Sequence, residues 1–452
     1  MWFEEANIYQ IYPIGMCGCP WENAASPADH DIFESGELPI PGTEHRIRMI
    51  GEHIDHIKSC GFDTVLFNPL FESDEHGYDI RNYRLLDHRL GTNEDLKELC
   101  EKLRAAGLRI MFDGVFNHMG RGSFAFQDVL KRREQSRYKN WFHINFYGDS
   151  PYHDGLSYEA WEGCYNLVKL NLSDPEVRSY IFESIRYWYE EFHISGLRLD
   201  VAYCMDRDFL RALRSFTREL SKDFFLFGEI MFGDYKCILQ DDMMDSVTNY
   251  ECQKGLVSSL NSMNLFEIAY SLNRQFGPDP WALYPGSHLQ SFVDNHDISR
   301  AATALSDEGK LPVLYGLLYG MPGIPTVYYG SEWGIKGDKK EGDRALRPSL
   351  FEPKENELTA SIRAFAGARK QSRALMYGDY RQLVVTNKQL VFERSIEGER
   401  VIVAVNADTE SFTAHFDARS GLGTDLIDGS VHDFGGGSEL EPLSVHYWRT
   451  ER

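Results

Sequence analysis

Several short apolar stretches of this chain end in polar side chains that can carry acid–base chemistry. Asp200, Glu229 and Asp297 stand at three of these ends. Other polar groups at such ends are Asp113, Asn117, His118, Arg198 and His296. Unpaired carboxylates repel one another, so a fold that gathers them needs a reason to do so. If the fold brings these residues together, the set indicates a catalytic site.

Arg198 and Asp200 stand two residues apart in an apolar run. Side chains at this spacing on a strand share one face, and a neighbouring cation favours the ionised carboxylate that a nucleophile needs. Glu229 follows an aromatic run, an environment that suits a carboxylic acid held for proton donation. Such a pair can cleave a glycosidic bond, and Asp297 could offset the positive charge that develops on the sugar. A structural ion pair at a strand end is the alternative for Arg198 and Asp200.

Apolar runs and amphipathic stretches alternate along most of the chain. Eight strands are predicted, near residues 8, 64, 110, 197, 225, 246, 290 and 325. Eight strands that alternate with helices predict an α/β fold, a (β/α)8 TIM barrel. The chemistry of such a barrel lies at the carboxyl ends of its strands. The polar residues above fall at the ends of the third, fourth, fifth and seventh strands, so we expect them on one rim.

The alternation of strands and helices is interrupted after His118 and gives way to strands alone near the C-terminus. After His118, about fifty residues rich in aromatic side chains show no regular period, and so long a structureless loop is unusual in a compact domain. We therefore predict an inserted subdomain over 119–171, with the catalytic barrel over 1–118 and 172–370. Residues 371–452 are predicted to form a C-terminal all-β sandwich domain. Its predicted strands are Gln382–Phe392, Arg400–Val405, Ser411–Phe416 and Ser444–Trp448.

The amino-acid composition indicates which kinds of molecule this chain can bind. The 452 residues include 47 basic and 69 acidic side chains, a net charge of −22, which disfavours nucleic acid and anionic membrane surfaces. Aromatic residues make up 13%, and flat rings can stack on the apolar faces of sugars. The sequence shows neither a signal peptide nor a membrane-spanning stretch, so we expect a cytoplasmic protein with reduced cysteines. Cys17 and Cys19 lack the further ligands of a zinc site, and no metal or other cofactor is predicted.

Five motifs in order resemble the α-amylase family of retaining glycoside hydrolases, which are (β/α)8 barrels. They are Asp113–His118, Gly196–Ala202, Gly228–Ile230, Phe292–Asp297 and Gly323–Glu332. The resemblance covers about residues 1–370, and a C-terminal β-domain fits the family too.

The resemblance implies a role for each matching residue. Asp200 is the implied nucleophile, Glu229 the acid/base and Asp297 the stabiliser of the transition state. Tyr78 should stack under the sugar at the cleavage site, His118 and His296 should bind its hydroxyl groups, and Asp343 and Arg347 should hold the next sugar outward. The implied substrate-binding residues are Tyr78, His118, Arg198, His296, Arg300, Asp343 and Arg347.

Three further segments resemble the cyclomaltodextrinase, neopullulanase and maltogenic amylase group. They are Phe126–Val129, Tyr138–His143 and Lys169–Asn171. Members of that group usually carry an N-terminal β-domain that builds their dimer, whereas this chain as given begins at the barrel and lacks it. The resemblance therefore leaves a monomer and a homodimer both open.

Two departures from that group lie beside the implied catalytic residues. Tyr203-Cys204 stands where the group usually has Asn-Glu, and Ile230-Met231 where it usually has Ile-Trp. These positions would line the side of the site that holds the leaving group or an acceptor. Pro13–Cys17 stands where some relatives have a calcium loop rich in Asp and Asn, so calcium is possible in the family but not expected here.

The resemblance implies a retaining hydrolase of α-1,4-glucosidic bonds that works through a covalent glycosyl-enzyme. Its implied partners are α-linked glucooligosaccharides: maltooligosaccharides, cyclodextrins or starch-like substrates. An α-glucosidase, an α-1,6-acting enzyme and a transglycosylase of the same family are alternatives. A non-catalytic carbohydrate-binding relative is a remote alternative, because such proteins lose the three carboxylates that this chain keeps.

Overall fold

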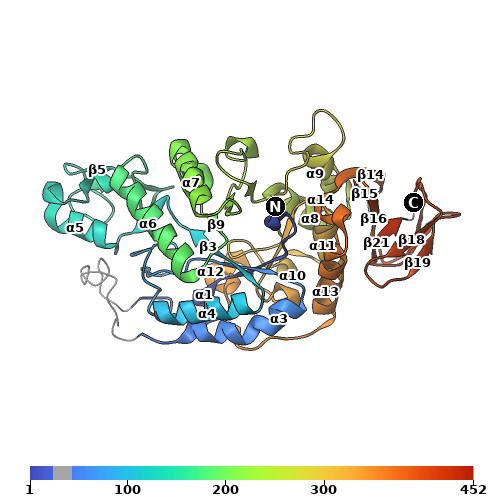
Figure 1. The fold of residues 1–452 in the computed structure, drawn as a ribbon, viewed down its shortest axis with the longest axis horizontal. Helices are drawn as coiled ribbons and strands as arrows, with labels where there is room; N and C mark the ends of the chain where they lie inside the picture. The colour runs from blue at the N-terminus through green and yellow to red at the C-terminus, as the bar shows by residue number, and fades with distance from the viewer. Residues whose placement is uncertain (24–42, 451–452) are drawn as a thin grey trace.

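The computed structural model describes residues 1–23 and 43–450. Residues 24–42 of the predicted barrel domain, and the last two residues of the predicted C-terminal domain, lie outside this description. Eight parallel strands form one sheet in the order β11-β10-β9-β3-β2-β1-β13-β12, and a parallel bridge from Thr248 to Gln290 joins its two edges. The predicted (β/α)8 barrel is thereby confirmed (Figure 1). Its strands are β1 (Ile8–Ile11), β2 (Thr64–Phe67), β3 (Arg109–Gly114), β9 (Gly196–Leu199), β10 (Phe225–Gly228), β11 (Ser246–Val247), β12 (Gln290–Ser291) and β13 (Ile324–Tyr328).

Successive side chains of the barrel strands point to opposite faces, and the two faces contribute to two separate apolar cores. One face of each strand packs against the helices, as Leu197 and Leu199 of β9 do. The other face fills the barrel with a separate cluster: Phe3, Ala6, Ile8, Leu66, Met111, Phe225, Phe227 and Ile324. Arg198 lies between the two outward leucines of β9 and therefore points into the barrel, above this apolar layer. The barrel interior is thus apolar toward the amino ends of the strands and charged at their carboxyl ends.

Helices surround the barrel, and polar caps fix where they begin. In α6, for example, Asp174 accepts hydrogen bonds from the backbone of Glu176 and Val177, and Pro175 occupies the first turn. The helices are α1 (Pro13–Met16), α3 (Ile54–Ser59), α4 (Asn93–Ala105), α5 (Phe124–Arg132), α6 (Pro175–Phe192), α7 (Arg207–Leu220), α8 (Tyr250–Ser262), α9 (Phe266–Phe276), α10 (Ala301–Ala304), α11 (Leu311–Gly320), α12 (Asp343–Leu346), α13 (Glu357–Lys370) and α14 (Arg373–Tyr377).

The chain between β3 and α6 folds into small sheets around α5, at the left in Figure 1. One sheet pairs β4 with β8 and β8 with β7, and a second pairs β5 with β6. Because β4 begins at His118, this sheet is anchored directly at the barrel rim. The strands are β4 (His118–Gly120), β5 (Ile144–Asn145), β6 (Ser157–Tyr158), β7 (Ala160–Trp161) and β8 (Cys164–Lys169).

The C-terminal residues form a six-stranded antiparallel sheet and a two-stranded one that share an apolar core including Val391, Ile402 and Trp448. The predicted all-β class is confirmed, but the single strand predicted over Gln382–Phe392 is wrong. A turn at Thr386, whose backbone and hydroxyl bond to Gln389, divides it into a hairpin. The strands are β14 (Asp379–Val385), β15 (Gln389–Ile396), β16 (Glu399–Asn406), β17 (Phe412–Ala414), β18 (Leu422–Asp425), β19 (Val431–Asp433), β20 (Ser438–Leu440) and β21 (Val445–Thr450).

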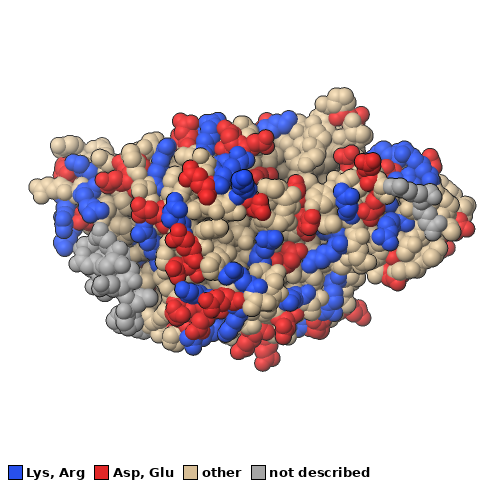
Figure 2. Space-filling model, viewed as in Figure 1, with Lys and Arg blue, Asp and Glu red and all other residues tan. Residues whose placement is uncertain are grey.

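Acidic and basic side chains alternate over the face shown in Figure 2, and acidic ones gather along its lower edge near α3 and α4. The negative net charge is therefore not confined to the catalytic rim. None of the helices in the described part of the chain has the length and apolar character needed to cross a lipid bilayer.

Candidate active site

One guanidinium lies at the centre of the barrel rim. Arg198 Nη1 contacts Asp113 Oδ2 at 2.6 Å and Asp200 Oδ1 at 3.3 Å, and its Nη2 contacts Glu229 Oε1 at 3.0 Å. All four side chains are nearly enclosed by protein. Strands β3, β9 and β10 each bring a carboxylate to this cation. The arrangement offsets their mutual repulsion and fixes Asp200 and Glu229 beside each other.

The backbone after Asp200 also holds Glu229. The amide of Val201 donates a hydrogen bond to Glu229 Oε2 at 3.0 Å. Val201 has φ 41°, a left-handed conformation that a β-branched residue rarely adopts and that costs about 1–3 kcal/mol. The strained turn aims the amide at the acid, a contact that residue types alone do not reveal. The hydroxyl of Tyr250, at the start of α8, lies 3.4 Å from Glu229 Oε1.

Asp297 follows β12 and stands in a different charge environment. His296 Nε2 contacts its Oδ2 at 2.9 Å, and Arg347 Nη2 contacts its Oδ1 at 3.1 Å. Burial acts to raise the pKa of Asp297, but the adjacent His296 and Arg347 hold it well below its ordinary value. Arg347 also reaches Asp343 Oδ2 at 3.3 Å. Asp297 is therefore a permanent anion whose side chain is still 33% exposed.

Tyr78 and His296 form a stacked pair at the rim. Their ring centroids lie 5.4 Å apart with planes inclined by 6°, and the hydroxyl of Tyr78 bonds to His296 Nε2 and, at 3.1 Å, to Asp113 Oδ2. Asn68 donates to the same Asp113 oxygen at 3.0 Å. Sequence reasoning missed Asn68, although it follows β2 as the other site residues follow their strands.

His118 is a neutral imidazole with one unpartnered hydrogen-bond donor. Asn117 Nδ2 donates to its Nδ1 at 3.2 Å, so the proton of the neutral ring is on Nε2. Nε2 is buried and has no hydrogen-bond partner among the described residues. Burial lowers the pKa of His118 to about 3, so the ring is uncharged at physiological pH. A sugar hydroxyl would satisfy this donor.

Arg300 is the one predicted substrate-binding residue that the structure does not bring to the rim. Its guanidinium is fully enclosed and donates to the carbonyl oxygens of Tyr329 at 2.8 Å and Leu346 at 3.1 Å, and to Ser331 Oγ at 2.9 Å. It also lies over the ring of Tyr328, 4.0 Å from the centroid. These contacts favour a structural role, in which Arg300 supports the loop after β13 from inside the protein, and its Nη2 has no hydrogen-bond partner among the described residues.

A substitution can separate this structural role from substrate binding. We expect Arg300→Met to lower the free energy of unfolding by about 3 kcal/mol, because it leaves buried carbonyl oxygens without donors. The Michaelis constant for maltotetraose should stay within about twofold of the wild-type value, since the side chain does not reach the ligand. Urea unfolding and steady-state kinetics test both values. A large rise in the Michaelis constant with unchanged stability would restore Arg300 to the binding site.

Burial changes the expected ionisation of Asp200. The sequence suggests that Arg198 keeps this carboxyl ionised, and Arg198 does lower its pKa. Burial nevertheless raises the pKa of Asp200 well above the ordinary value of 3.8, and the carboxylates of Glu229, Asp113 and Asp297 add to the increase. The sequence-based prediction of the Asp200 charge considered the ion pair with Arg198. It did not include the burial of Asp200 or the neighbouring carboxylates.

The sign of this shift predicts the acid limb of the pH–activity profile. A nucleophile must be ionised, and a raised pKa means that Asp200 takes up its proton at a higher pH than an ordinary aspartate. We therefore expect kcat/KM for maltotetraose to fall as pH decreases through a value above about 4. Full activity retained below pH 4 would contradict the raised pKa. The measurement is a pH–rate profile with a check that the protein stays folded.

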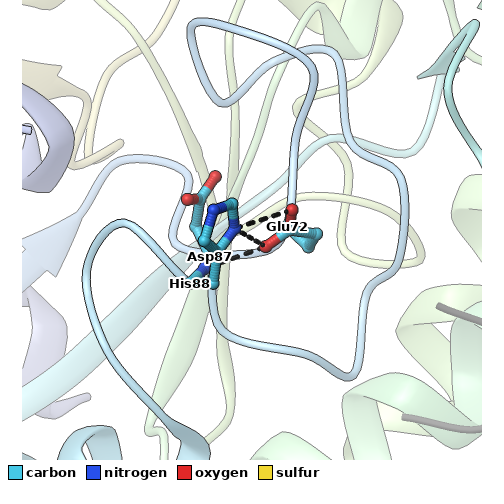
Figure 3. Close-up of side chains that lie close together, drawn as sticks. All are labelled: Glu72, Asp87 and His88. Carbon is cyan, nitrogen blue, oxygen red and sulfur yellow. Dashed lines mark hydrogen bonds and ion pairs between the residues drawn. The ribbon is translucent and has the colours of Figure 1, made fainter. Parts of the chain in front are cut away.

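Glu72, Asp87 and His88 lie close enough together to resemble a metal site, but their partners indicate an ion-pair network (Figure 3). Arg89 occupies both oxygens of Asp87, with Nε at 2.8 Å from Oδ1 and Nη2 at 2.6 Å from Oδ2. His88 Nδ1 lies 3.1 Å from each oxygen of Glu72. Burial lowers the pKa of His88, but Glu72 and Asp87 raise it above its ordinary value, which favours the protonated ring over a ligand. A divalent cation would have to displace Arg89.

The segment after β1, where the sequence predicts no calcium loop, is α1. This segment, Pro13–Met16, is buried and contains no carboxylate. Its residue types therefore do not fit a hard cation, which prefers oxygen ligands.

The parallel barrel and its carboxylate rim define a glycoside hydrolase of the (β/α)8 class. The chain belongs to the α-amylase family, since residues 46–377 match the family described as the alpha amylase catalytic domain. It is 30% identical to a cyclomaltodextrinase of Geobacillus thermopakistaniensis, with 91% of this chain and 70% of that protein covered. It is also 30% identical to neopullulanase 2 of Thermoactinomyces vulgaris, with 91% and 71% covered.

Among solved structures, the chain resembles the cyclic α-maltosyl-(1→6)-maltose hydrolase of Arthrobacter globiformis. The two are 29% identical, the match covers 100% of both chains, and the TM-score is 0.82. That enzyme has also been solved in complex with its cyclic sugar and with maltose.

Proposed function

We propose that this chain is a retaining α-glucan hydrolase that cleaves α-1,4-glucosidic bonds in maltooligosaccharides or cyclic glucooligosaccharides. The observation that carries the proposal is the single guanidinium that joins Asp200 to Glu229, with the Val201 amide on the second oxygen of Glu229. Two carboxyl groups held close together are the arrangement of retaining glycosidases. The names of the relatives support this substrate class, and the intracellular maltogenic amylase of Bacillus subtilis among them supports a cytoplasmic location.

The proposed reaction has two displacements. In the first, Asp200 attacks the anomeric carbon while the bond to the leaving oxygen breaks and Glu229 donates its proton to that oxygen. In the second, Glu229 takes a proton from water, whose oxygen attacks the same carbon and releases Asp200. Asp297, held as an anion by His296 and Arg347, offsets the positive charge that develops on the sugar ring in both steps.

The proposed binding residues complete the site around the sugar that is attacked. Tyr78 offers a ring held parallel to His296, and His118 offers its unpartnered Nε2 to a hydroxyl group. His296 Nε2 contacts Tyr78 and Asp297, so it would bind a sugar hydroxyl by exchanging one of these partners. Arg347 and Asp343 lie beyond Asp297, where the next sugar outward would be held. The enclosed Arg198 orients the two carboxylates from below.

A hydrolase of cyclic glucooligosaccharides that contain α-1,6 bonds is the second candidate. It is favoured by the match along the whole length of both chains to the cyclic α-maltosyl-(1→6)-maltose hydrolase. The relatives named cyclomaltodextrinase are longer than the matched region, with 70–74% of their length covered.

A product profile separates the candidates. Purified protein is incubated with maltose through maltoheptaose, β-cyclodextrin, cyclic maltosyl-maltose, pullulan, panose and isomaltose, and products are resolved by chromatography over time. Release of maltose and glucose from the linear series or from β-cyclodextrin supports the α-1,4 assignment. A strong preference for cyclic maltosyl-maltose supports the second candidate. Cleavage of isomaltose alone would contradict both.

A further inference from the structure

A cavity lies at the amino ends of three neighbouring barrel strands, on the side of the barrel opposite the catalytic rim. Its volume is about 490 Å³. Among the residues that line it, Arg109 is the first of β3, Ser195 directly precedes β9, and Phe224 directly precedes β10. Strand β9 pairs with both β3 and β10, so these residues meet at one place. The cavity is therefore separate from the site at the carboxyl ends.

Four charged side chains line this cavity without pairing. Arg104, Arg109, Glu190 and Asp223 are exposed, and none of their charged groups forms an ion pair or hydrogen bond with a described residue. The guanidinium of Arg109 instead lies over the ring of Trp2, 4.6 Å from its centroid. The indole Nε1 of Trp2 donates to the backbone oxygen of Asp223 at 2.9 Å, which leaves the carboxylate unoccupied. Two cations and two anions thus keep their hydrogen-bonding capacity for a ligand.

Aromatic rings form another part of the wall. The rings of Tyr189, on α6, and Phe224 have centroids 6.3 Å apart and planes inclined by 51°. Tyr189 and Trp2 are only half-buried. A wall that combines apolar rings with donors and acceptors suits a sugar, which has apolar faces and hydroxyl groups at its edges. The volume lies in the range of small-molecule sites, about 300–1,000 Å³.

The electrostatics of the cavity favour a neutral ligand. The four charged side chains contribute no net charge, because two are basic and two are acidic. Helices α4, α6 and α7 end beside the cavity, at Ala105, Phe192 and Leu220, and the carboxyl end of a helix carries a partial negative charge. A phosphate group would meet these helix ends, and a cation would meet the two guanidinium groups. Hydroxyl groups can accept from the arginines and donate to the carboxylates.

Resting on the proposed function for the choice of sugar, we infer that this cavity is a second binding site for an α-linked glucan chain, remote from the catalytic rim. Arg104 and Arg109 donate to hydroxyl oxygens, Glu190 and Asp223 accept from hydroxyl groups, and Tyr189 packs against a sugar face. A short oligosaccharide at the rim does not reach this cavity. A long chain can be held there while another part of it enters the rim, which raises the local concentration of cleavable bonds.

Calorimetric titration of maltotetraose into Asp200→Asn protein tests for the second site without cleavage. We expect two binding events, one at the rim and one at the cavity. Adding Arg109→Ala and Glu190→Ala together should raise the dissociation constant of one event at least about tenfold and leave the other unchanged, because a donor and an acceptor are lost. Lys102→Ala is the matched control, since Lys102 is an exposed basic residue of α4, as Arg104 is, but does not line the cavity.

Activity on a long and a short substrate gives a second readout. In the wild-type background, Arg109→Ala with Glu190→Ala should lower kcat/KM for soluble starch about threefold, because the polymer is no longer held at the second site. The value for maltotetraose should stay within about twofold of wild type, because the cavity lies away from the rim. Circular dichroism checks that the double variant is folded.

The outcomes are distinct. A single maltotetraose event, or two events that the double variant leaves unchanged, overturns the second site. Binding of inorganic phosphate that the double variant abolishes would make the cavity an anion site and overturns it too. An equal loss on starch and maltotetraose overturns the role in holding a long chain. If the wild-type protein cleaves neither substrate, the proposed function fails, whereas a sugar-binding event that the double variant removes would still support the cavity as a sugar site.

Discussion

Asp200→Asn should lower kcat on maltotetraose by about four orders of magnitude or more, because a neutral amide cannot form the covalent glycosyl-enzyme. Asparagine has nearly the shape of aspartate and can still accept a hydrogen bond from Arg198. The loss should therefore come from chemistry and not from packing. Stopped assays with high enzyme concentration measure the residual rate.

Two controls accompany this variant. Its circular dichroism spectrum and thermal unfolding should match those of the wild-type protein. The exposed Tyr147→Ala should retain full activity. An Asp200→Asn protein with more than about a tenth of the wild-type rate would remove Asp200 from the role of nucleophile.

Glu229→Gln should give a large effect that depends on the leaving group. On maltotetraose, whose leaving oxygen needs a proton, we expect kcat/KM to fall about a thousandfold. On α-maltosyl fluoride the first displacement needs no proton, so its rate should fall less than about tenfold. Burst kinetics separate the first displacement from the second, which still needs Glu229 as a base.

The ratio between the two substrates is the informative quantity. A fall of equal size in the first displacement of both would mean that glutamine disturbs the site through Arg198 or Val201 and would argue against proton donation by Glu229. Asp200→Asn is the matched comparison, since removal of the nucleophile should slow both substrates alike.

Much of the fold could be predicted because its signals are local. The apolar runs of the eight barrel strands differ from the helical periodicity between them, and each run became a strand. The C-terminal domain shows the limit of that reasoning. The sequence predicts one strand over residues 382–392, whereas a turn at Thr386, whose backbone and hydroxyl bond to Gln389, makes a hairpin of it. The short strands β18 and β19 depend on pairing with β21 and with each other, which no local pattern records.

The candidate site was predictable where it depends on residue type at a strand end. Arg198, Asp200 and Glu229 follow from position alone. The contribution of Val201 is made by its backbone amide in a strained conformation, so the residue type carries no signal for it. Arg300 shows the opposite case, because the family resemblance implied a ligand contact for this residue, three positions after Asp297. Its long side chain instead turns inward to the carbonyl oxygens of Tyr329 and Leu346.

The ionisation of Asp200 could not be predicted from its neighbour in sequence. Arg198 is two residues away in the sequence, whereas the carboxylates of Asp113, Glu229 and Asp297 come from three other strand ends and the enclosure comes from the whole fold. The balance between one cation and several buried anions is a property of the assembled rim.

The anomeric form of the first product tests the central claim most directly. Proton NMR spectra recorded in the first seconds to minutes of maltotetraose hydrolysis, before the sugars equilibrate, report the anomer that the enzyme releases. Two displacements at the same carbon, through Asp200 and then water, predict that the α-anomer appears first. Initial release of the β-anomer would mean a single displacement by water and would contradict a covalent role for Asp200.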